Sequence, residues 1–259
     1  MNRHNRDSLE YETFDKLDRL GIPHAIFTRK GGVSPEPWAS LNLGGTVGDD
    51  QERVQENRYR AFQALNFSIE KSYDVWQVHS SRIICVDQPR KSSEPLIQAD
   101  GMVTNQSGVI LFMRFADCVP IIMVDPIQKA IGLIHAGWKG TLYRIAEAAL
   151  RTMETHYGSK PRDILVGLGP SIGAHHYQVG SEIYEQAKRT LPQDISEIFE
   201  IKDQKFYLDL WRANQLILQQ NGVKSIELAG QCTACHLEDW FSHRAEQGKT
   251  GRFGVIICL

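Results

Sequence analysis

Short apolar runs rich in β-branched residues recur along the whole of this 259-residue chain and constrain its fold more than any other feature. Runs of this length and composition are typical of β-strands, and several are apolar enough to be buried on both faces of a sheet. We expect strands over Ile22–Thr28, Arg82–Val86, Val109–Arg114, Val119–Val124, Ala130–Ile134, Ile164–Leu168, Ser225–Leu228 and Gly254–Cys258.

Helical periodicity separates several of these runs. The clearest pattern is Thr141–Thr155, where Leu142, Ile145 and Ala149 share one apolar face behind Thr141 as the N-cap. The other predicted helices are Leu208–Asn221, closed by Gly222, and Glu52–Leu65 and Ser181–Leu191. Strands and helices interleave without a strict βαβ rhythm, so we predict a mixed-sheet α/β or α+β domain whose helices cover the sheet faces.

The composition is that of an ordinary globular protein, with 42% hydrophobic residues, 23% charged residues and a formal net charge of −2. It excludes disordered, collagenous and fibrous classes. The balanced charge gives no electrostatic reason to expect nucleic acid or an anionic membrane as a partner. No repeat is visible, and the prolines and polar residues of Gln88–Gln98 predict a surface loop within one domain.

The chain offers no sign of export or of membrane insertion. Residues 1–20 alternate charged and polar side chains and lack the apolar core of a signal peptide. The longest apolar stretches, Val109–Phe112 and Val119–Val124, are far shorter than the roughly 20 residues that a membrane helix requires. Five cysteines, sparse and odd in number, argue against a disulfide scaffold. We therefore expect a cytoplasmic protein with reduced thiols.

Three candidate metal ligands lie beside predicted strands. Cys118, next to Asp117, stands between two apolar runs, His135 ends a strand that leads into the clearest helix, and His79 precedes another strand. A thiolate and two imidazoles suit zinc and leave its fourth tetrahedral position for water. The separations match no short zinc motif, however. The sequence does not separate a zinc-bound thiolate from a Cys118 nucleophile activated by His135, and a buried, inert thiol is the remaining alternative.

A second group of histidines and cysteines looks less informative. The segment from Cys232 to His236 matches the C-x-x-C-H pattern of haem attachment, but such attachment requires export. We therefore interpret it as a turn with free thiols. His175 and His176 are merely adjacent, with no partner pattern. The thiols left without a role are Cys85, Cys232, Cys235 and Cys258.

Two glycine-rich turns carry hydroxyl groups, at Gly31–Ser34 and Gly167–Gly173. The second lacks the G-x-G-x-x-G spacing, so a dinucleotide site is not supported, and glycines that merely permit tight turns are the commoner case. Basic side chains elsewhere could still complete a phosphate-type anion pocket. They are Arg29, Lys139, Arg244 and Arg252.

The combination of segments is more specific than any one of them, above all His-Ala-Gly-Trp-Lys-Gly paired with Ala-Asp-Cys. The segments are Thr28–Ser34, Leu41–Gly44, Gln77–His79, Ala116–Pro120, His135–Gly140, Gly169–Gly173 and Phe241–Arg244. On these residues the chain resembles the purine nucleoside phosphorylase family formerly called multicopper polyphenol oxidase or laccase-domain proteins, which includes the bacterial peptidoglycan editing factors. The departures are Phe115, where many relatives have a small or hydroxylated residue, and His243, where an aromatic such as tyrosine is common.

The resemblance implies a single domain of mixed sheets sandwiched between helices, like cytotoxic necrotizing factor and laccase-domain proteins. In these terms residues 1–21 are an N-terminal extension and residues 22–259 the domain. It also implies a zinc held by His79, Cys118 and His135, with copper as the alternative metal.

The implied activity is phosphorolysis of adenosine, inosine, guanosine and methylthioadenosine, with hydrolytic deamination of adenosine and a possible role in peptidoglycan editing. For deamination, we expect zinc to activate the water that attacks the amino-bearing carbon, with Cys118 and Asp117 as catalytic residues. Asp117 would carry a proton or only position its neighbour. The alternatives are a copper-dependent polyphenol oxidase, a Cys118–His135 hydrolase and a non-enzymatic envelope module. Multicopper oxidation would need more histidines than the three-ligand site offers.

The partners expected from the resemblance are purine nucleosides and phosphate. We expect the Gly31–Ser34 turn to hold phosphate with Arg29 and Lys139, and Trp138 either to stack on the purine or to lie in the core. The residues predicted to bind substrate are Arg29, Gly32, Ser34, Asn42, Lys139 and Arg244.

Overall fold

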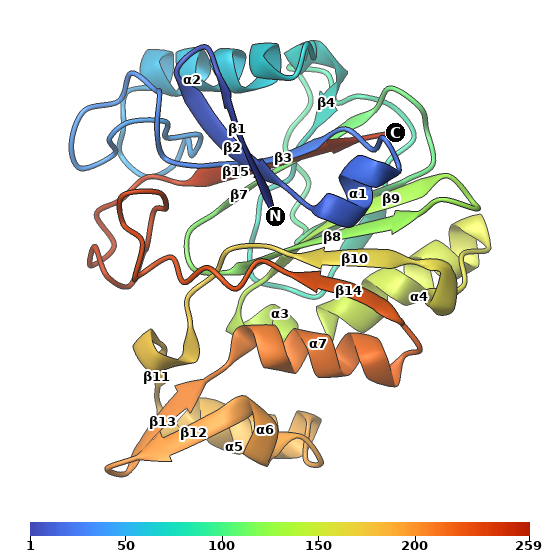
Figure 1. The fold of residues 1–259 in the computed structure, drawn as a ribbon, viewed down its shortest axis with the longest axis vertical. Coiled ribbons are helices and arrows are strands. Elements are labelled where there is room, and N and C mark those ends of the chain that lie inside the picture. Colours follow the sequence, from blue (N-terminus) through green and yellow to red (C-terminus); the bar gives the residue numbers. More distant parts are fainter.

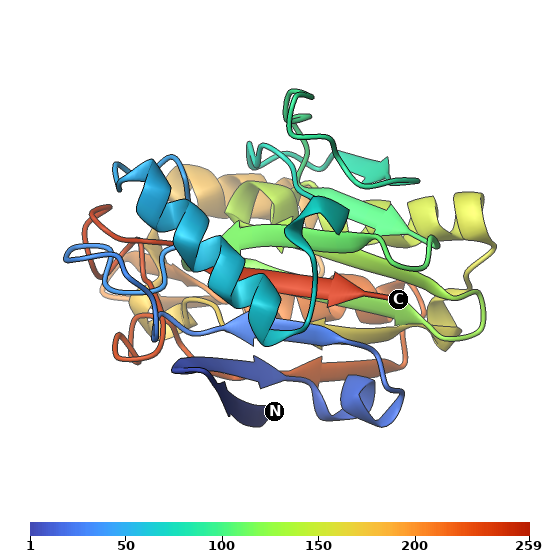
Figure 2. The same ribbon diagram turned by 90° about the horizontal axis from the view of Figure 1, so that it is seen from above.

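Two six-stranded sheets, stacked face to face, form the centre of the computed structural model, which describes all 259 residues (Figures 1 and 2). The first sheet has the order β1-β2-β3-β15-β7-β4, and only β4 runs parallel to its neighbour. Its strands are β1 (Asn2–Arg6), β2 (Leu9–Thr13), β3 (His24–Phe27), β4 (Ser72–Tyr73), β7 (Ile110–Phe115) and β15 (Phe253–Cys258).

The second sheet has the order β14-β10-β8-β9-β6-β5. Its inner strands are antiparallel, and the two edge strands, β14 and β5, run parallel to their neighbours. Its strands are β5 (Ile83–Cys85), β6 (Gly101–Thr104), β8 (Val119–Asp125), β9 (Ala130–Ala136), β10 (Leu165–Leu168) and β14 (Ser225–Leu228). Every residue of β8 and β9 is buried, as expected for strands covered on both faces.

Helices cover the outer face of each sheet and complete four layers (Figure 1). Helix α2 (Gln51–Ala64) packs on the first sheet, where Phe62 meets Phe112 edge-on with ring centroids 5.6 Å apart. The second sheet is covered by α3 (Trp138–Leu142), α4 (Ile145–Tyr157) and α7 (Leu210–Gln220). A further core, including Leu111, Ile122 and Phe253, fills the space between the sheets. No helix combines the length and apolarity needed to cross a membrane.

A smaller layer lies beyond α7 at the lower end of Figure 1. Its three-stranded antiparallel sheet has the order β11-β13-β12 and carries two helices. The elements are β11 (Gln178–Val179), β12 (Phe199–Lys202), β13 (Lys205–Leu208), α5 (Ser181–Thr190) and α6 (Ile195–Ile198). Short 3₁₀ turns elsewhere are η1 (Ile69–Lys71), η2 (Pro161–Asp163) and η3 (Ala174–His176).

The structure confirms the predicted mixed α/β single domain and the predicted strands, which appear as β3, β5, β7, β8, β9, β10, β14 and β15. It also confirms α2, α5 and α7, and Gly222 ends α7 with a φ of 92°. Residues 88–97 contain no helix or strand, as predicted for a loop. The sequence did not predict β1 or β12, because mostly exposed strands lack the alternation of a half-buried strand.

The predicted helix Thr141–Thr155 is wrong at its start. The chain forms two helices, α3 and α4, because Arg144 adopts the left-handed conformation with a φ of 58°. Thr141 lies inside α3 and caps nothing, and its buried hydroxyl accepts a hydrogen bond from the Asn214 amide at 2.9 Å. The apolar period continues across the break, so it could not reveal the change of direction.

Residues 1–21, expected to precede the domain as an extension, contribute two strands and the helix α1 (Asp15–Arg19). Strand β2 pairs with β3, placing Tyr11 opposite Phe27, and β1 then pairs with β2. Phe14, at the end of this segment, is fully buried between the two large sheets. The extension thus widens the first sheet, while the boundary at residue 22 stays a prediction.

Candidate metal and substrate site

Three residues far apart in the sequence form one cluster of metal-binding atoms. His135 lies near the end of β9, opposite Pro120 of β8, so Cys118 in the turn before β8 is brought next to it. His79 comes from the loop between β4 and β5, with its Nε2 atom 3.9 Å from Cys118 Sγ. One ligand atom from each residue lies within 4.8 Å of the others. The strand register therefore assembles the triad that the sequence predicted.

Asp100, just before β6, organises this cluster. Its carboxylate accepts a hydrogen bond from His135 Nδ1 at 2.9 Å, leaving Nε2 as the atom available to a metal. It also accepts hydrogen bonds from the backbone N–H groups of Val78, His79 and Ser80, which hold His79 at a positive φ of 59°. Sequence reasoning missed Asp100, because the buried strand that follows it, Gly101–Thr104, was not predicted either.

Electrostatics prepare Cys118 to bind a cation. Burial alone would raise the pKa of the thiol, but the charge and hydrogen bonds of His135 and His79 lower that pKa to about 6. Burial likewise opposes the charge on His135, yet the Cys118 thiolate and the Asp100 carboxylate raise the pKa of the imidazole. Cys118 is therefore largely a thiolate at neutral pH, the form that binds metals and attacks electrophiles.

Gly137 explains part of the His-Ala-Gly-Trp-Lys-Gly segment. A Cβ atom at this position would lie 2.9 Å from Cys118 Sγ and 3.0 Å from His79 Cδ2. Real Cβ atoms do not approach other atoms so closely, so only glycine allows the backbone to pass beside the cluster. Glycine is thus required here for space near the ligands.

The cluster opens into a cavity of about 670 Å³. The side chains of Trp76, Trp138, Tyr177 and His243 line it together with the three candidate ligands. Burial, and then the charge of Arg252, lowers the pKa of His243, so its imidazole is neutral at pH 7. A volume of this size with aromatic and polar walls fits a small organic molecule.

Five arginines line the same cavity, namely Arg58, Arg90, Arg114, Arg244 and Arg252. Arg90 and Arg114 both pair with Asp74, at 3.0 and 2.6 Å, so that carboxylate offsets part of their charge.

Three of these arginines have no carboxylate partner: the exposed Arg244 and the half-buried Arg58 and Arg252. Arg58 donates to the carbonyl of Leu43, and Arg252 donates to the carbonyls of Thr250 and Gly251. Burial is the main cause that lowers the pKa of both, to about 10 for Arg58, and both stay protonated at pH 7. Half-buried guanidinium groups without a carboxylate partner favour an anionic ligand in the cavity.

Asp117 has its carboxylate fully engaged. It adopts a left-handed φ of 76°, and Oδ1 accepts hydrogen bonds from the hydroxyls of Thr233 and Ser242, both at 2.7 Å. Its Oδ2 accepts from the backbone N–H of Arg244 at 2.6 Å. Of the two roles that the sequence left open for Asp117, this geometry favours positioning of the Cys118 turn over proton transfer.

Among the residues predicted to bind substrate, Arg244 lines the cavity. Its guanidinium lies over the Tyr177 ring, 5.0 Å from the centroid, and donates to the carbonyl of Gln178. Lys139 is exposed on α3 and does not line the cavity.

The remaining predicted residues form a neighbouring support. Arg29 pairs with Glu246 at 3.1 Å and donates to the carbonyl of Ala39, so its charge is already compensated. Ser34 and Asn42 are buried and both donate to Asp49. A Cβ on Gly32 would lie 2.1 Å from the carbonyl oxygen of Ser40, so this glycine permits close packing of two backbones. None of the four lines the cavity.

Comparison with known proteins places this geometry in a family. Residues 23–259 match a family described as multi-copper polyphenol oxidoreductase laccase. A protein of Deinococcus radiodurans named purine nucleoside phosphorylase is 35% identical over 244 residues, covering 94% of this chain and 92% of the relative. The purine nucleoside phosphorylase YlmD of Bacillus subtilis is 37% identical over 242 residues, covering 90% and 86% of the two chains.

Solved structures agree with these sequence relatives. YlmD from Geobacillus stearothermophilus superposes with a TM-score of 0.92 at 34% identity, covering 98% of this chain and 97% of that one. The hypothetical protein YfiH of Bacillus licheniformis superposes with a TM-score of 0.90 at 30% identity, covering 99% and 98%. The likeness therefore extends over the whole fold.

Proposed function

Because the chain belongs to the family described as multi-copper polyphenol oxidoreductase laccase, with relatives named purine nucleoside phosphorylase, we propose that it is a zinc-dependent purine nucleoside phosphorylase. Its substrates would be adenosine, inosine, guanosine and methylthioadenosine, cleaved by phosphate to the free base and the sugar 1-phosphate. A second activity would be the hydrolytic deamination of adenosine.

One observation carries this proposal: a single cavity holds both a His–Cys–His cluster and two half-buried arginines without a carboxylate partner. Phosphorolysis needs an anion beside the sugar of a neutral nucleoside, and the cavity supplies cationic and aromatic walls together. We assign the phosphate to Arg58 and Arg252, because Arg29, the arginine expected from the sequence, is already paired with Glu246.

The donor set of the cluster fits zinc. Imidazole and thiolate groups both bind zinc, and three protein ligands leave the fourth position open, as in catalytic zinc sites; a tetrahedral ion would separate a sulfur and a nitrogen ligand by about 3.6 Å. The distance of 3.9 Å between Cys118 Sγ and His79 Nε2 is close to this value. When bound, zinc would supply Lewis-acid chemistry for deamination. Copper, which the family description mentions, is the alternative metal for the same ligands.

The chain's own residues would orient the reactants. Arg58 and Arg252 hold phosphate, and the Trp138 and Tyr177 side chains, which line the cavity, offer apolar surface to the purine. In phosphorolysis a phosphate oxygen bonds to the anomeric carbon of the sugar while the bond from that carbon to the purine nitrogen breaks, and a proton neutralises the leaving base. Asp117 keeps the Cys118 turn in place through its hydrogen bonds to Thr233, Ser242 and Arg244.

The Cys118–His135 pair also favours a second candidate, a thiol hydrolase, because the thiolate form that suits a metal suits a nucleophile equally well. Removal of metal separates the two. A metal-dependent phosphorylase loses activity on exhaustive chelation and regains it with zinc. A thiol hydrolase keeps its activity without metal and loses it on alkylation of Cys118.

Incubation with adenosine, with and without phosphate, followed by product identification by mass spectrometry, tests the main proposal. We expect adenine and ribose 1-phosphate only with phosphate present, and inosine under both conditions. Dioxygen uptake with a phenolic substrate, coupled to bound copper, would instead establish the oxidase. No turnover of adenosine by the zinc-loaded protein would refute the nucleoside assignment.

We also propose a cytoplasmic location, which is supported by five cysteines that are all unpaired in the structure. A role in peptidoglycan editing, which the family resemblance implies, stays a prediction.

A further inference from the structure

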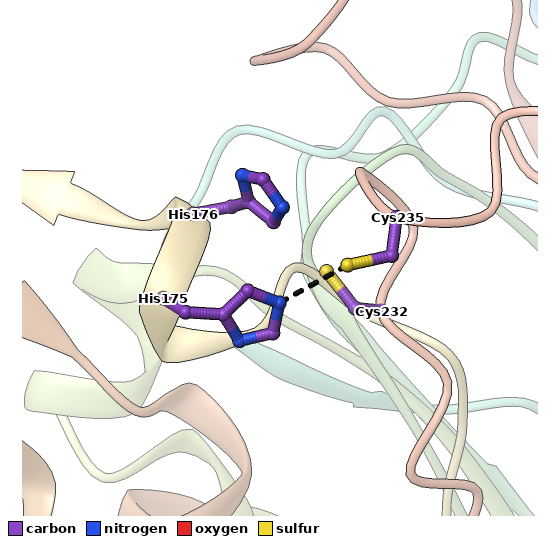
Figure 3. A group of neighbouring side chains, drawn as sticks. All are labelled: His175, His176, Cys232 and Cys235. Carbon is purple, nitrogen blue, oxygen red and sulfur yellow. Dashed lines mark hydrogen bonds between the residues drawn. The ribbon is translucent and has the colours of Figure 1, made fainter.

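A second group of histidines and cysteines lies outside the cavity. His175 and His176 belong to η3, and Cys232 and Cys235 to the turn after β14 (Figure 3). One ligand atom of each lies within 4.8 Å of the others, and none of the four lines the cavity. From the sequence, these histidines had no partner pattern and these thiols no role. The structure corrects the first interpretation, because it brings the two pairs together.

From this juxtaposition we propose that His175, His176, Cys232 and Cys235 form a second metal site, which takes zinc. Two imidazoles and two thiolates make up a donor set that zinc binds in structural sites. Four protein ligands close the tetrahedron and leave no position for substrate, so the site is structural. Binding releases the two thiol protons to solvent and involves no electron transfer.

The distances support a common ligand for these side chains. His175 Nε2 lies 3.1 Å from Cys235 Sγ, and the two imidazole rings have centroids 4.6 Å apart. Figure 3 shows the ring of His175 directed toward the sulfur atoms across the gap between the two segments. Neither cysteine is in a disulfide. Four donors from two separate segments thus point to one small region.

The backbone beside Cys232 fixes the position of its sulfur atom. The N–H of Gly173 donates a hydrogen bond to Cys232 Sγ at 3.1 Å. A Cβ on Gly173 would lie 2.6 Å from His175 Cε1 and 3.3 Å from Cys232 Sγ. A larger residue here would therefore push the two ligands apart.

A metal at this position would join two segments that hold the turn around Cys118, one of the three candidate ligands in the cavity. Ser171, before η3, donates to the carbonyl of Asp117 at 2.6 Å, and Thr233, between the two cysteines, donates to the Asp117 carboxylate at 2.7 Å. The segments already meet through a bridge between Ser171 and Cys232. A zinc ion bound by His175, His176, Cys232 and Cys235 would thus stabilise the hydrogen bonds that hold the Cys118 turn, without contacting substrate.

The test is a count of bound zinc. The full-length protein is saturated with zinc, freed of excess by gel filtration, and analysed by elemental mass spectrometry. We expect two zinc ions per chain in the wild type and one in Cys235→Ala, an exposed position whose substitution leaves the core intact. The matched control is His236→Ala, because this histidine is exposed, adjacent to Cys235 and outside the cluster, and we expect it to keep two.

Cobalt in place of zinc gives a second measurement. Thiolate-to-cobalt charge-transfer absorption should fall on Cys235→Ala and stay unchanged on His236→Ala. Equal zinc counts in the wild type and Cys235→Ala would overturn the proposal. A Cys232–Cys235 disulfide, seen in the wild type as a mass lower by two hydrogen atoms together with one bound zinc, would also overturn it. The zinc count does not depend on nucleoside turnover. A failure of the second metal site can therefore be distinguished from a failure of the phosphorylase assignment.

Discussion

The two His–Cys clusters use the same chemistry in opposite surroundings. The inner cluster of His79, Cys118 and His135 opens into a cavity, offers three candidate ligands and is held by the Asp100 carboxylate. The outer cluster of His175, His176, Cys232 and Cys235 offers four candidate ligands, of which only Cys232 is buried. A carboxylate behind a histidine and an open position are features of reactive metal sites, whereas a closed set of four is typical of structural ones.

Ligand type alone therefore does not decide what such a cluster does. What differs is the material around the ligands: the inner cluster faces aromatic and cationic walls, and the outer cluster faces solvent. Substitutions in and around the inner cluster should therefore act on catalysis, with effects that decrease with distance from the metal.

The largest expected effect is that of Cys118→Ala. We expect loss of one metal ion and of both nucleoside activities, by more than the roughly 100-fold that removal of a residue supporting a ligand causes. Metal analysis and product assays on the same preparation measure it. The control is Cys85→Ala, because Cys85 is a partly buried free thiol that belongs to neither cluster. Full activity of metal-free Cys118→Ala would rule out the zinc proposal.

Asp100→Asn should have the next largest effect. The neutral amide of asparagine lacks the negative charge with which the Asp100 carboxylate orients His135. Zinc affinity and turnover should therefore fall by about 10-fold to 100-fold. Competition with a chelator gives the affinity. Asp87→Asn serves as the control, because Asp87 is exposed and lies outside both clusters. Unchanged affinity in Asp100→Asn would show that the carboxylate holds only the His79 loop.

Arg58→Ala tests the anion site in the cavity. Loss of a charge-assisted hydrogen bond of about 1.5–3 kcal/mol should raise the KM for phosphate by roughly 10-fold to 100-fold, and adenosine deamination should change much less. Steady-state kinetics with phosphate varied would show this. Arg53→Ala, exposed on the same helix, should leave both activities unchanged. Equal losses of phosphorolysis and deamination would mean that Arg58 acts only through the fold.

The smallest change is a difference in thiol reactivity, measured on metal-free protein with iodoacetamide and peptide mass spectrometry. Cys118, with a pKa of about 6, is mainly thiolate at pH 7, and its alkylation rate should fall as the pH drops through 6. Burial and then the Cys232 thiol raise the pKa of Cys235, so its rate should increase only at alkaline pH. Faster reaction of the more exposed Cys235 at pH 7 would contradict these electrostatics.

Much of the fold and the ligand triad could be predicted from the sequence. Buried strands such as β8 and β9 are continuous apolar runs, so their existence follows from composition. The triad followed from the family resemblance, since spacings of 39 and 17 residues carry no zinc motif. The left-handed Arg144 and the exposed strand β1 leave no periodic signal, and both were missed.

The residues that would bind substrate could not be chosen from the sequence. Arg29 and Arg58 are alike in sequence as basic side chains, but only the folded chain places Glu246 against one and leaves the other facing the cavity. By itself the sequence determined the strands that are continuous apolar runs, most of the helices and the residue types able to bind a metal, because these depend on local composition. The tertiary structure decided which charges are compensated, which acid supports His135 and which histidines meet cysteines, because those contacts join residues that only sheet register and loop packing bring together.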